Sequence, residues 1–317
     1  MQKHMLFVMD PIAHINPKKD STLAIALAAQ DAGWTLSYAE LKDLYLSHGN
    51  ACAQVKPLSV MASNDNWFEL GEEKTIQLDN SFTIMMRKDP PFDSPFLYAT
   101  HILQRAQNAG SLVVNNPQSL RDCNEKLFAT EFPDLCPPLV VSNNPSILRK
   151  FYNDHQDVIF KPLDGMGGSG IFRCKPNDSN LASILEVLTN NGQEYIMGQK
   201  FIAAINAGDK RILMVDGVPI DYALARIPAK GELRGNLAAG GTGIAQPLSE
   251  RDREIANCVG PTLKARGLMF VGLDVIGDYL TEINVTSPTC IREIDKAYNT
   301  KIGNKLINAI EQKLQTQ

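Results

Sequence analysis

The residues of this chain whose types and spacing could do chemistry are two lysines, a glycine-rich loop and a late group of oxygen ligands. In chain order they are Lys126, Lys161, the glycines from Gly165 to Gly170, Asp274, Glu282 and Asn284. Ammonium groups and the bare backbone amides of a glycine loop suit phosphates, whereas carboxylate and amide oxygens suit Mg²⁺. The order therefore indicates a site for a nucleoside triphosphate and two magnesium ions.

The first part of this pattern is weak when it stands alone. Lys161 follows the apolar run 158–160 of the predicted strand 158–162 and precedes Gly165, Gly167 and Gly168. The loop lacks the G-x-x-x-x-G-K-[ST] order of a P-loop, and its place between β-strands does not fit a Rossmann turn. A lysine whose stem packs while its ammonium reaches water is the ordinary alternative. The nucleotide interpretation therefore depends on the other residues.

The acidic part of the pattern lies on a predicted hairpin of strands 270–276 and 279–283. Glu282 and Asn284 are two residues apart and must share a face. A three-residue connection, 277–279, would place Asp274 opposite Glu282, whereas a two-residue connection would place it opposite Thr281 and break the site. Apolar neighbours favour a buried hairpin over a charged outer face, and we predict these three residues as Mg²⁺ ligands.

The elements that must position these residues alternate in the first part of the chain. Predicted strands 6–9, 35–40, 82–86 and 112–114 are interspersed with helices 22–32 and 95–109. Such alternation predicts an α/β fold with a mainly parallel sheet and with ligands at the carboxyl ends of its strands. Those ends carry segments 10–16 and 87–93. The second segment, with its charges beside Pro90-Pro91, could hold a small zwitterionic substrate or be a solvated loop with internal ion pairs.

The second part of the chain predicts a different architecture. Stretch 116–122 is rich in turn residues, and a short helix at 124–131 would present Lys126. Antiparallel strands are expected at 139–141, 158–162, 171–174, 195–200, 211–215 and 218–225, with an Asp216-Gly217 hairpin turn and helices at 146–155, 181–189 and 249–266. We therefore expect domains 1–123 and 124–317, the second with subdomains of about 130–200 and 201–317.

Segment 226–243 is long, rich in glycine and small residues, and carries Arg226, Lys230 and Arg234. This composition is typical of a lid that closes over a ligand and excludes water. Its arginines would offset the charge of a transferring phosphoryl group. A passive surface insertion is the alternative.

Composition excludes several classes of function. The chain has 317 residues, a formal net charge of -4 and no long basic block, so we expect no nucleic-acid partner. Its start has no apolar run long enough for a signal peptide or a membrane span, so we expect a cytoplasmic protein. Six scattered cysteines without a C-x-x-C pair argue against a zinc site and a disulfide framework.

Several longer strings of the sequence resemble the ATP-grasp carboxylate-amine ligases and, more narrowly, the bacterial glutathione synthetases. They are MDPI (9–12), MRKDPPFD (86–93), SLRDCNEKL (119–127), KPLDGMGG (161–168), RGNLAAGG (234–241) and TEINVTSPT (281–289). The resemblance implies an N-terminal α/β domain followed by a two-subdomain ATP-grasp fold. It also implies that ATP, γ-glutamylcysteine and glycine give glutathione, ADP and phosphate through an acyl phosphate, with two Mg²⁺ ions, for which Mn²⁺ could substitute, in a homotetramer.

The resemblance also implies roles for individual residues. Nucleotide binding would fall to Lys126, Lys161, Gly165, Gly167, Gly168, Gln199, Phe201, Ile202 and, at the ribose, Asp209. Arg211 and Arg226 would stabilise the transition state and the acyl phosphate, and Arg234 and Asn236 would contact ligand from the lid. The peptide substrate would be held by Asp10, Arg87, Asp89 and Arg292.

Two other functions are compatible with the same residues. A different ATP-grasp ligase, such as a dipeptide ligase, would share the nucleotide and metal sites, and segment 87–93 is what separates the two. A non-catalytic ATP-binding regulator would be expected to lack a metal ligand or the lid cations, and neither is missing. The lid departs from the family at Thr242, where we expect a basic residue, so its closure or its affinity for glycine should differ.

Overall fold

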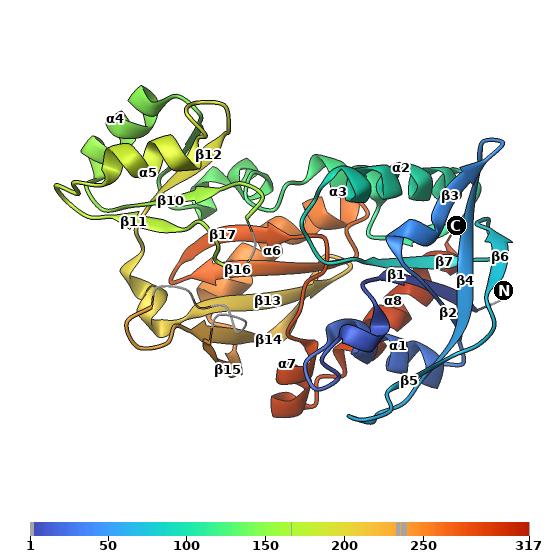
Figure 1. Cartoon of the computed structure of the whole chain (residues 1–317). Coiled ribbons are helices and arrows are strands. Elements are labelled where there is room, and N and C mark those ends of the chain that lie inside the picture. Colours follow the sequence, from blue (N-terminus) through green and yellow to red (C-terminus); the bar gives the residue numbers. More distant parts are fainter. Residues whose placement is uncertain (1–2, 166, 233–234, 236–239, 317) are drawn as a thin grey trace.

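The computed structural model describes residues 3–165, 167–232, 235 and 240–316, and arranges them in three lobes that are each built on one sheet (Figure 1). The first sheet has the order β3-β4-β2-β1-β7-β8, with β5 and β6 also paired to β4. Its strands are β1 (His4–Met9), β2 (Thr35–Ala39), β3 (Leu44–Ser47), β4 (Asn50–Val60), β5 (Phe68–Leu70), β6 (Lys74–Gln77), β7 (Thr83–Arg87) and β8 (Leu112–Val114). Its helices are α1 (Ser21–Asp31) and α2 (Ser94–Asn108).

The parallel pairing expected from the sequence holds at the centre of this sheet, where β1 lies between β2 and β7 and β7 pairs with β8. Alternate side chains of β1 enter two cores: Leu6 packs in the cluster that holds residues of α2, and Phe7 in the cluster that holds residues of α1. Burial on both faces explains why the strand is continuously apolar. Strands β3 to β6 were not predicted, and they make the sheet mixed because they pair antiparallel.

The connection between the first two lobes differs from the prediction. Residues 117–122 form a short helix, α3 (Pro117–Asp122), and Lys126 lies in a turn before the 3-10 helix η3 (Phe128–Glu131). The predicted helix at 124–131 is therefore wrong in its first half. The Asn124 side-chain oxygen accepts the backbone N–H groups of Lys126 and Leu127, at 3.1 Å each, and this local turn competes with a helix.

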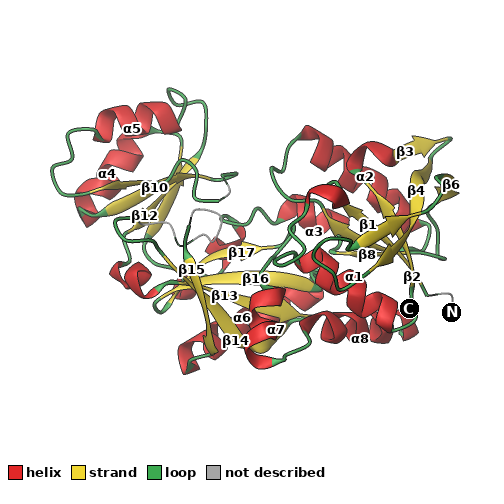
Figure 2. Ribbon diagram, turned by 60° about the horizontal axis from the view of Figure 1, so that its bottom comes forward, coloured by secondary structure: helices red, strands yellow, loops and turns green. Residues whose placement is uncertain are grey.

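The second lobe is a four-stranded antiparallel sheet with the order β11-β10-β12-β9 (Figure 2). Its elements are β9 (Leu139–Ser142), α4 (Pro145–His155), β10 (Val158–Pro162), β11 (Phe172–Cys174), α5 (Leu181–Leu188) and β12 (Ile196–Lys200). Leu148 of α4, Leu185 of α5 and Phe160 of β10 share one buried cluster. The predicted strands and the two helices of this lobe are confirmed.

The third lobe is a five-stranded antiparallel sheet with the order β15-β14-β13-β16-β17. Its elements are β13 (Asp209–Val215), β14 (Val218–Ile227), β15 (Thr242–Pro247), α6 (Glu250–Ala265), β16 (Phe270–Ile276) and β17 (Tyr279–Asn284). Asp216 and Gly217 have positive φ in the predicted hairpin turn, and Ser249 with Asp252 forms the predicted capping box of α6. Strand β15 was not predicted.

Helix α6 packs so closely on the β13–β14 turn that we expect Gly260→Ala to destabilise the protein. A Cβ at Gly260 would lie 2.2 Å from the Gly217 carbonyl oxygen, and both atoms belong to rigid elements. The expected loss is about 1–3 kcal/mol of unfolding free energy, as for other overpacked sites. Urea denaturation measures it. Cys258→Ala, at an exposed position of the same helix, should leave the unfolding midpoint unchanged.

The segment after β17 returns to the first lobe. Helix α7 (Ile291–Tyr298) leads to α8 (Ile302–Gln315), which packs against α1. Trp34 Nε1 donates to the Glu311 carboxylate at 3.0 Å, and Lys3 pairs with the same oxygen. The remaining short helices are η1 (Ile12–His14), η2 (Leu41–Asp43), η4 (Pro133–Leu135) and η5 (Ala203–Ala207).

Two further expectations concern the whole chain. All six cysteines are free thiols, as their spacing predicted, and five of them are buried. Of the helices in the described ranges, none combines the length and the apolar character that crossing a membrane would require.

Candidate active site

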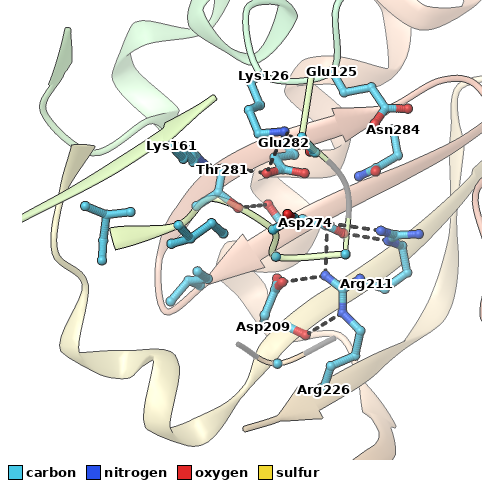
Figure 3. Close-up of a pocket in the computed structure, with 18 of the residues that line it drawn as sticks. Glu125, Lys126, Lys161, Asp209, Arg211, Arg226, Asp274, Thr281, Glu282 and Asn284 are labelled. Atoms are coloured by element: carbon cyan, nitrogen blue, oxygen red, sulfur yellow. Dashed lines mark hydrogen bonds and ion pairs between the residues drawn. The ribbon is translucent and has the colours of Figure 1, made fainter. Parts of the chain in front are cut away.

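A cavity of about 350 Å³ lies where the three lobes meet, and it gathers most of the residues that the sequence singled out. Figure 3 shows its central side chains. The second lobe supplies Lys161, the glycine loop and the end of β12, while β13, β14, β16 and β17 supply the acidic and guanidinium groups. Its volume is in the range of ordinary small-molecule sites.

The acidic hairpin reaches the predicted alignment by an unpredicted route. Its connection is the two-residue one, since Ile276 pairs with Tyr279 and Val275 with Leu280. A β-bulge at Thr281 then shifts the register, so that Asp274 pairs with Glu282 after all. The Thr281 hydroxyl donates to the Asp274 carbonyl at 3.1 Å and helps to hold the bulge. The side chains of Asp274 and Glu282 are thus directed to one cavity.

Glu282 lies between the two predicted phosphate-binding lysines. Its Oε1 is 3.7 Å from Lys126 Nζ and 3.6 Å from Lys161 Nζ. Lys126 Nζ also donates to the Gly165 carbonyl at 2.8 Å, which ties the glycine loop to the same cluster. Burial lowers the pKa of Lys161, and the charge of Lys126 adds to this shift while Glu282 opposes it. Three segments that are far apart in the sequence therefore converge on one point.

A second cluster links two arginines to two aspartates. Arg211, which faces Asp274 from the adjacent strand, donates from Nε to Asp274 Oδ1 at 2.5 Å. Arg226 Nη2 lies 2.5 Å from Asp209 Oδ2 and 2.9 Å from Asp274 Oδ2. The alternation of charges along this chain of contacts stabilises each group in a cavity wall that excludes most water.

The two aspartates of this cluster differ in their proton affinity. Burial is the largest influence on both and favours the neutral form. At Asp274 the guanidinium groups of Arg211 and Arg226 outweigh burial and hold the pKa well below its usual range. At Asp209 burial raises the pKa to about 7 against the charge of Arg226, and the charges of Asp274 and Glu282 push it in the same direction.

The oxygen ligands fit magnesium in part. Glu282 keeps a partly exposed carboxylate, and Asn284 donates from its Nδ2 to the Gly272 carbonyl at 3.3 Å, which leaves its Oδ1 available. Both oxygens of Asp274 are engaged by guanidinium groups. Within the described part of the chain, no group of three His, Cys, Asp or Glu side chains is arranged to hold a metal. Glu282 and Asn284 are hard ligands that Mg²⁺ could share with phosphate oxygens and water.

The other side of the cavity is apolar and suits a flat aromatic ring. Its lining includes Ile159, Ile171, Phe201, Ile202, Ile205 and Ile276. Two polar atoms at this end, Gln199 Oε1 and Asp209 Oδ1, are buried and have no hydrogen-bond partner among the described residues. Buried polar atoms usually find a partner, so these two fit a ligand with hydrogen-bonding groups.

The glycine loop has the backbone that a phosphate cradle needs. Gly167 and Gly168 have φ of +64° and +81°, a region in which other residues are strained. A Cβ at Gly165 would lie 2.7 Å from Pro162 Cγ, so the loop also lies too close to β10 for a side chain there. Met166 lies outside the described residues.

Of the remaining predicted residues, some line the cavity and others lie outside it. Asp89 lines the cavity, and its N–H donates to Asp10 Oδ2 at 2.9 Å because β1 and β7 are parallel neighbours. Asp10, Arg87 and Arg292 are not in the cavity lining. Arg87 is buried behind it and donates to the Pro288 carbonyl at 2.9 Å, whereas Arg292, on α7, lines shallower surface pockets. Arg234 and Asn236 lie outside the described residues, so the structure does not bear on their predicted lid contacts.

Sequence reasoning missed several lining residues, among them Glu125, Thr281 and Thr286. Thr286 donates its hydroxyl to Glu125 Oε1 at 2.7 Å. Burial raises the pKa of Glu125, and Glu282 adds to this shift while the Thr286 hydrogen bond opposes it. Glu125 directly precedes Lys126, and a single glutamate at that place carries no signal of its own.

The position of Arg211 depends on a glycine, and we expect Gly272→Ala to impair catalysis without removing a charge. A Cβ at Gly272 would lie 2.7 Å from Arg211 Cδ and 3.1 Å from Pro288 Cβ, so the guanidinium must move. Displacing a positioned group by about 1 Å can cost about a hundredfold in rate. Steady-state kinetics at saturating ATP measures the loss. A normal kcat in a folded variant would show that Arg211 need not be held there.

Comparison with known proteins supports one family over the whole chain. Residues 4–121 match the model for the prokaryotic glutathione synthetase N-terminal domain, and residues 125–299 match the model for the prokaryotic glutathione synthetase ATP-grasp domain. Glutathione synthetase from Pseudomonas putida is 62% identical over 317 residues and covers all of both chains. The enzyme from Salmonella typhimurium is 57% identical over 307 residues, with 97% of this chain and 98% of its own covered.

Solved structures with the same fold are much more distant in sequence. D-cycloserine synthetase DcsG superposes with a TM-score of 0.69 at 13% identity, over 98% of this chain and 99% of its own. The ATP-grasp ligase PsnB, solved with minimal precursor, Mg and ADP, gives a TM-score of 0.63 at 15% identity, over 99% of each chain. These likenesses show the ATP-grasp fold. Taken with the full-length relatives, they lead to one conclusion: the chain belongs to the prokaryotic glutathione synthetase family and is an ATP-dependent ligase.

Proposed function

We propose that the cavity joins γ-glutamylcysteine to glycine with ATP and Mg²⁺, and that the residues gathered in it carry out the two steps of that reaction. The observation that carries the proposal is the convergence of Lys126 and Lys161 on Glu282, whose Oε1 lies 3.7 Å and 3.6 Å from their ammonium groups. The apolar end of the cavity would take the adenine, Gln199 and Asp209 would bind polar groups of the nucleoside, and the glycine loop would bind phosphates.

The chemistry requires an activated carboxylate. A carboxylate does not react with an amine at neutral pH because its leaving group would be oxide. Transfer of the γ-phosphoryl group of ATP to a cysteinyl carboxylate oxygen breaks the bond to ADP and forms an acyl phosphate. The glycine ammonium first loses a proton; its nitrogen then attacks the carbonyl carbon, phosphate is expelled, and the nitrogen loses a second proton as the amide forms. No covalent enzyme intermediate is needed, so catalysis is positioning and charge stabilisation.

The cations of the site have distinct roles in this scheme. Lys126 and Lys161 would bind the phosphates, and Lys161 is buried enough for its charge to act strongly. Arg211 and Arg226, held by Asp274, would face the phosphoryl group in transfer and the acyl phosphate. Preorganised donors of this kind contribute about 3–4 kcal/mol each to transition-state stabilisation.

Glu282 and Asn284 would hold magnesium at the polyphosphate, and Asp274 would join them by exchanging a guanidinium contact for the metal. Bound Mg²⁺ would supply neutralisation of the developing phosphate charge. Two ions, with Mn²⁺ as a substitute, remain our expectation. Binding of Mn²⁺ to the protein with and without a non-hydrolysable ATP analogue, followed by electron paramagnetic resonance, would count them.

Release of ADP tests the proposed substrates. We expect it to require γ-glutamylcysteine and glycine together, and to be near background with either alone. Turnover with two amino acids or with another dipeptide, but not with this pair, would favour a different ligase on the same fold. Activity with both substrates would also exclude a non-catalytic regulator.

Three broader expectations belong to the same proposal. A division into domains 1–123 and 124–317 should be visible as two units in limited proteolysis. The family resemblance favours a homotetramer, which light scattering coupled to gel filtration would detect. A cytoplasmic location fits the free thiols, and fractionation of producing cells would test it.

A further inference from the structure

Glu125 is a carboxylate in the cavity that the scheme above leaves without a role. Its backbone carbonyl accepts the Ile283 N–H at 2.9 Å, which fixes it beside the metal-binding end of β17. Its Oε1 accepts the Thr286 hydroxyl at 2.7 Å, and the side chain lines the cavity. Figure 3 shows Glu125 near Asn284, on the other side of Glu282 from Lys161. It therefore lies away from Lys161, although its neighbour in the chain is Lys126.

The charge balance of the cavity distinguishes Glu125 from the other carboxylates in its lining. Asp209 is paired with Arg226, Asp274 with both arginines, and Glu282 with both lysines. Among the residues that the structure describes, the Glu125 carboxylate makes no direct ion pair: its hydrogen-bond partner is the neutral Thr286 hydroxyl, and the charges of Lys126 and Arg211 act on it from a longer distance. Asp89 also lacks an ion pair, but it is exposed at the cavity rim and water solvates it. Glu125 is partly buried, and a carboxylate that is withdrawn from water without a direct cation partner can gain one from a ligand.

We propose that Glu125 binds the ammonium group of the incoming glycine. The inference rests on the proposed function, because it takes the amine substrate from there. The glycine nitrogen must come to rest next to the acyl phosphate, and Glu125 is the cavity carboxylate that lies beside the candidate metal ligands and yet keeps an unused oxygen. A charged ammonium and a fixed carboxylate oxygen make a short, strong hydrogen bond.

A purely structural role would not require the charge. The contact with Thr286 needs an acceptor, which a glutamine carbonyl supplies equally well, and the contact with Ile283 uses the backbone. Glu125→Gln should therefore keep both contacts and lose only the negative charge. Glu125→Asp keeps the charge on a shorter side chain and should recover part of any loss.

The test compares glycine with hydroxylamine, an amine that is uncharged at neutral pH and can trap an acyl phosphate. In Glu125→Gln we expect the KM for glycine to rise about 10- to 100-fold, in line with loss of a hydrogen bond to a charged group. The KM for γ-glutamylcysteine and the rate of hydroxylamine-dependent ADP release should stay at the wild-type values. Glu131→Gln is a matched control, because Glu131 lies on the same connection and pairs with Arg266 outside the cavity.

Each other outcome has a definite meaning. An unchanged KM for glycine in Glu125→Gln would overturn the proposal, and so would an equal loss with glycine and hydroxylamine, which would assign Glu125 to the fold or to the first step. If Asp89→Asn raised the KM for glycine and Glu125→Gln did not, the ammonium group would be bound by Asp89 at the cavity rim, and the proposal for Glu125 would be overturned. If the wild-type protein fails with hydroxylamine and with glycine, the acyl phosphate scheme itself is wrong.

Discussion

Glu282→Gln is expected to reduce ligase turnover at least about a thousandfold. The change removes the carboxylate charge that we propose as a magnesium ligand and that lies between two lysines. Its Oε1 lies 3.7 Å and 3.6 Å from Lys126 and Lys161. A metal ion contributes several kcal/mol to stabilising a phosphoryl-transfer transition state, and glutamine is a much weaker ligand. ATP should still bind weakly, since both lysines remain. ADP release and equilibrium dialysis with labelled ATP measure the two effects.

The control for this variant is Glu194→Gln, the same exchange at an exposed position of the second lobe. It should retain full turnover. A Glu282→Gln protein with wild-type kcat would remove Glu282 from the site. Loss of turnover together with a large fall in the thermal midpoint would indicate a structural role instead, so both proteins should be melted.

Lys161→Ala is expected to lower kcat/KM for ATP by about two to three orders of magnitude. The lysine is buried, and its ammonium lies 3.6 Å from Glu282 Oε1, so that water cannot readily replace it as a phosphate ligand. Loss of one preorganised donor in a site of this kind costs about a hundred- to a thousandfold. The effect should appear in both KM for ATP and kcat, which initial-rate kinetics with varied ATP separates.

Lys175→Ala, at an exposed position just after β11 in the same lobe, is the matched control and should behave as wild type. The structure adds one further expectation for Lys161→Ala. Glu282 would keep Lys126 as a cation partner, so the fold should tolerate the change. Kinetics indistinguishable from wild type would refute a phosphate role for Lys161.

Local sequence patterns predicted the elements whose own residues specify them. The Asp216-Gly217 turn and the Ser249 cap are each specified by a few adjacent residues, and the structure has both. The same holds for strand β10, which carries Lys161, since an apolar run followed by a glycine loop needs no distant partner to be recognised. Of these elements, β10 brings Lys161 to the cavity.

What escaped prediction depends on partners elsewhere in the chain. No sequence signal in residues 279–284 predicts the β-bulge at Thr281. The alignment of Asp274 with Glu282 depends on this bulge. Strand β15 has a glycine-rich start and forms because β14 offers it a free edge. The turn at Lys126 is decided by one side chain, Asn124, that outcompetes a helix. The pairing of Arg211 with Asp274 follows from the register of β13 on β16, which sequence spacing does not reveal.

The position of helix α8 at the end of the chain affects how the protein folds during synthesis. Its apolar residues Leu306, Ile307 and Ile310 complete the core that Leu23 and Ile25 of α1 begin. During synthesis, that face of α1 stays uncovered until residues 302–315 have been made, so the first lobe cannot reach its final packing early. A truncated protein that retains every residue of the cavity but lacks α8 would expose this apolar face and be prone to aggregate.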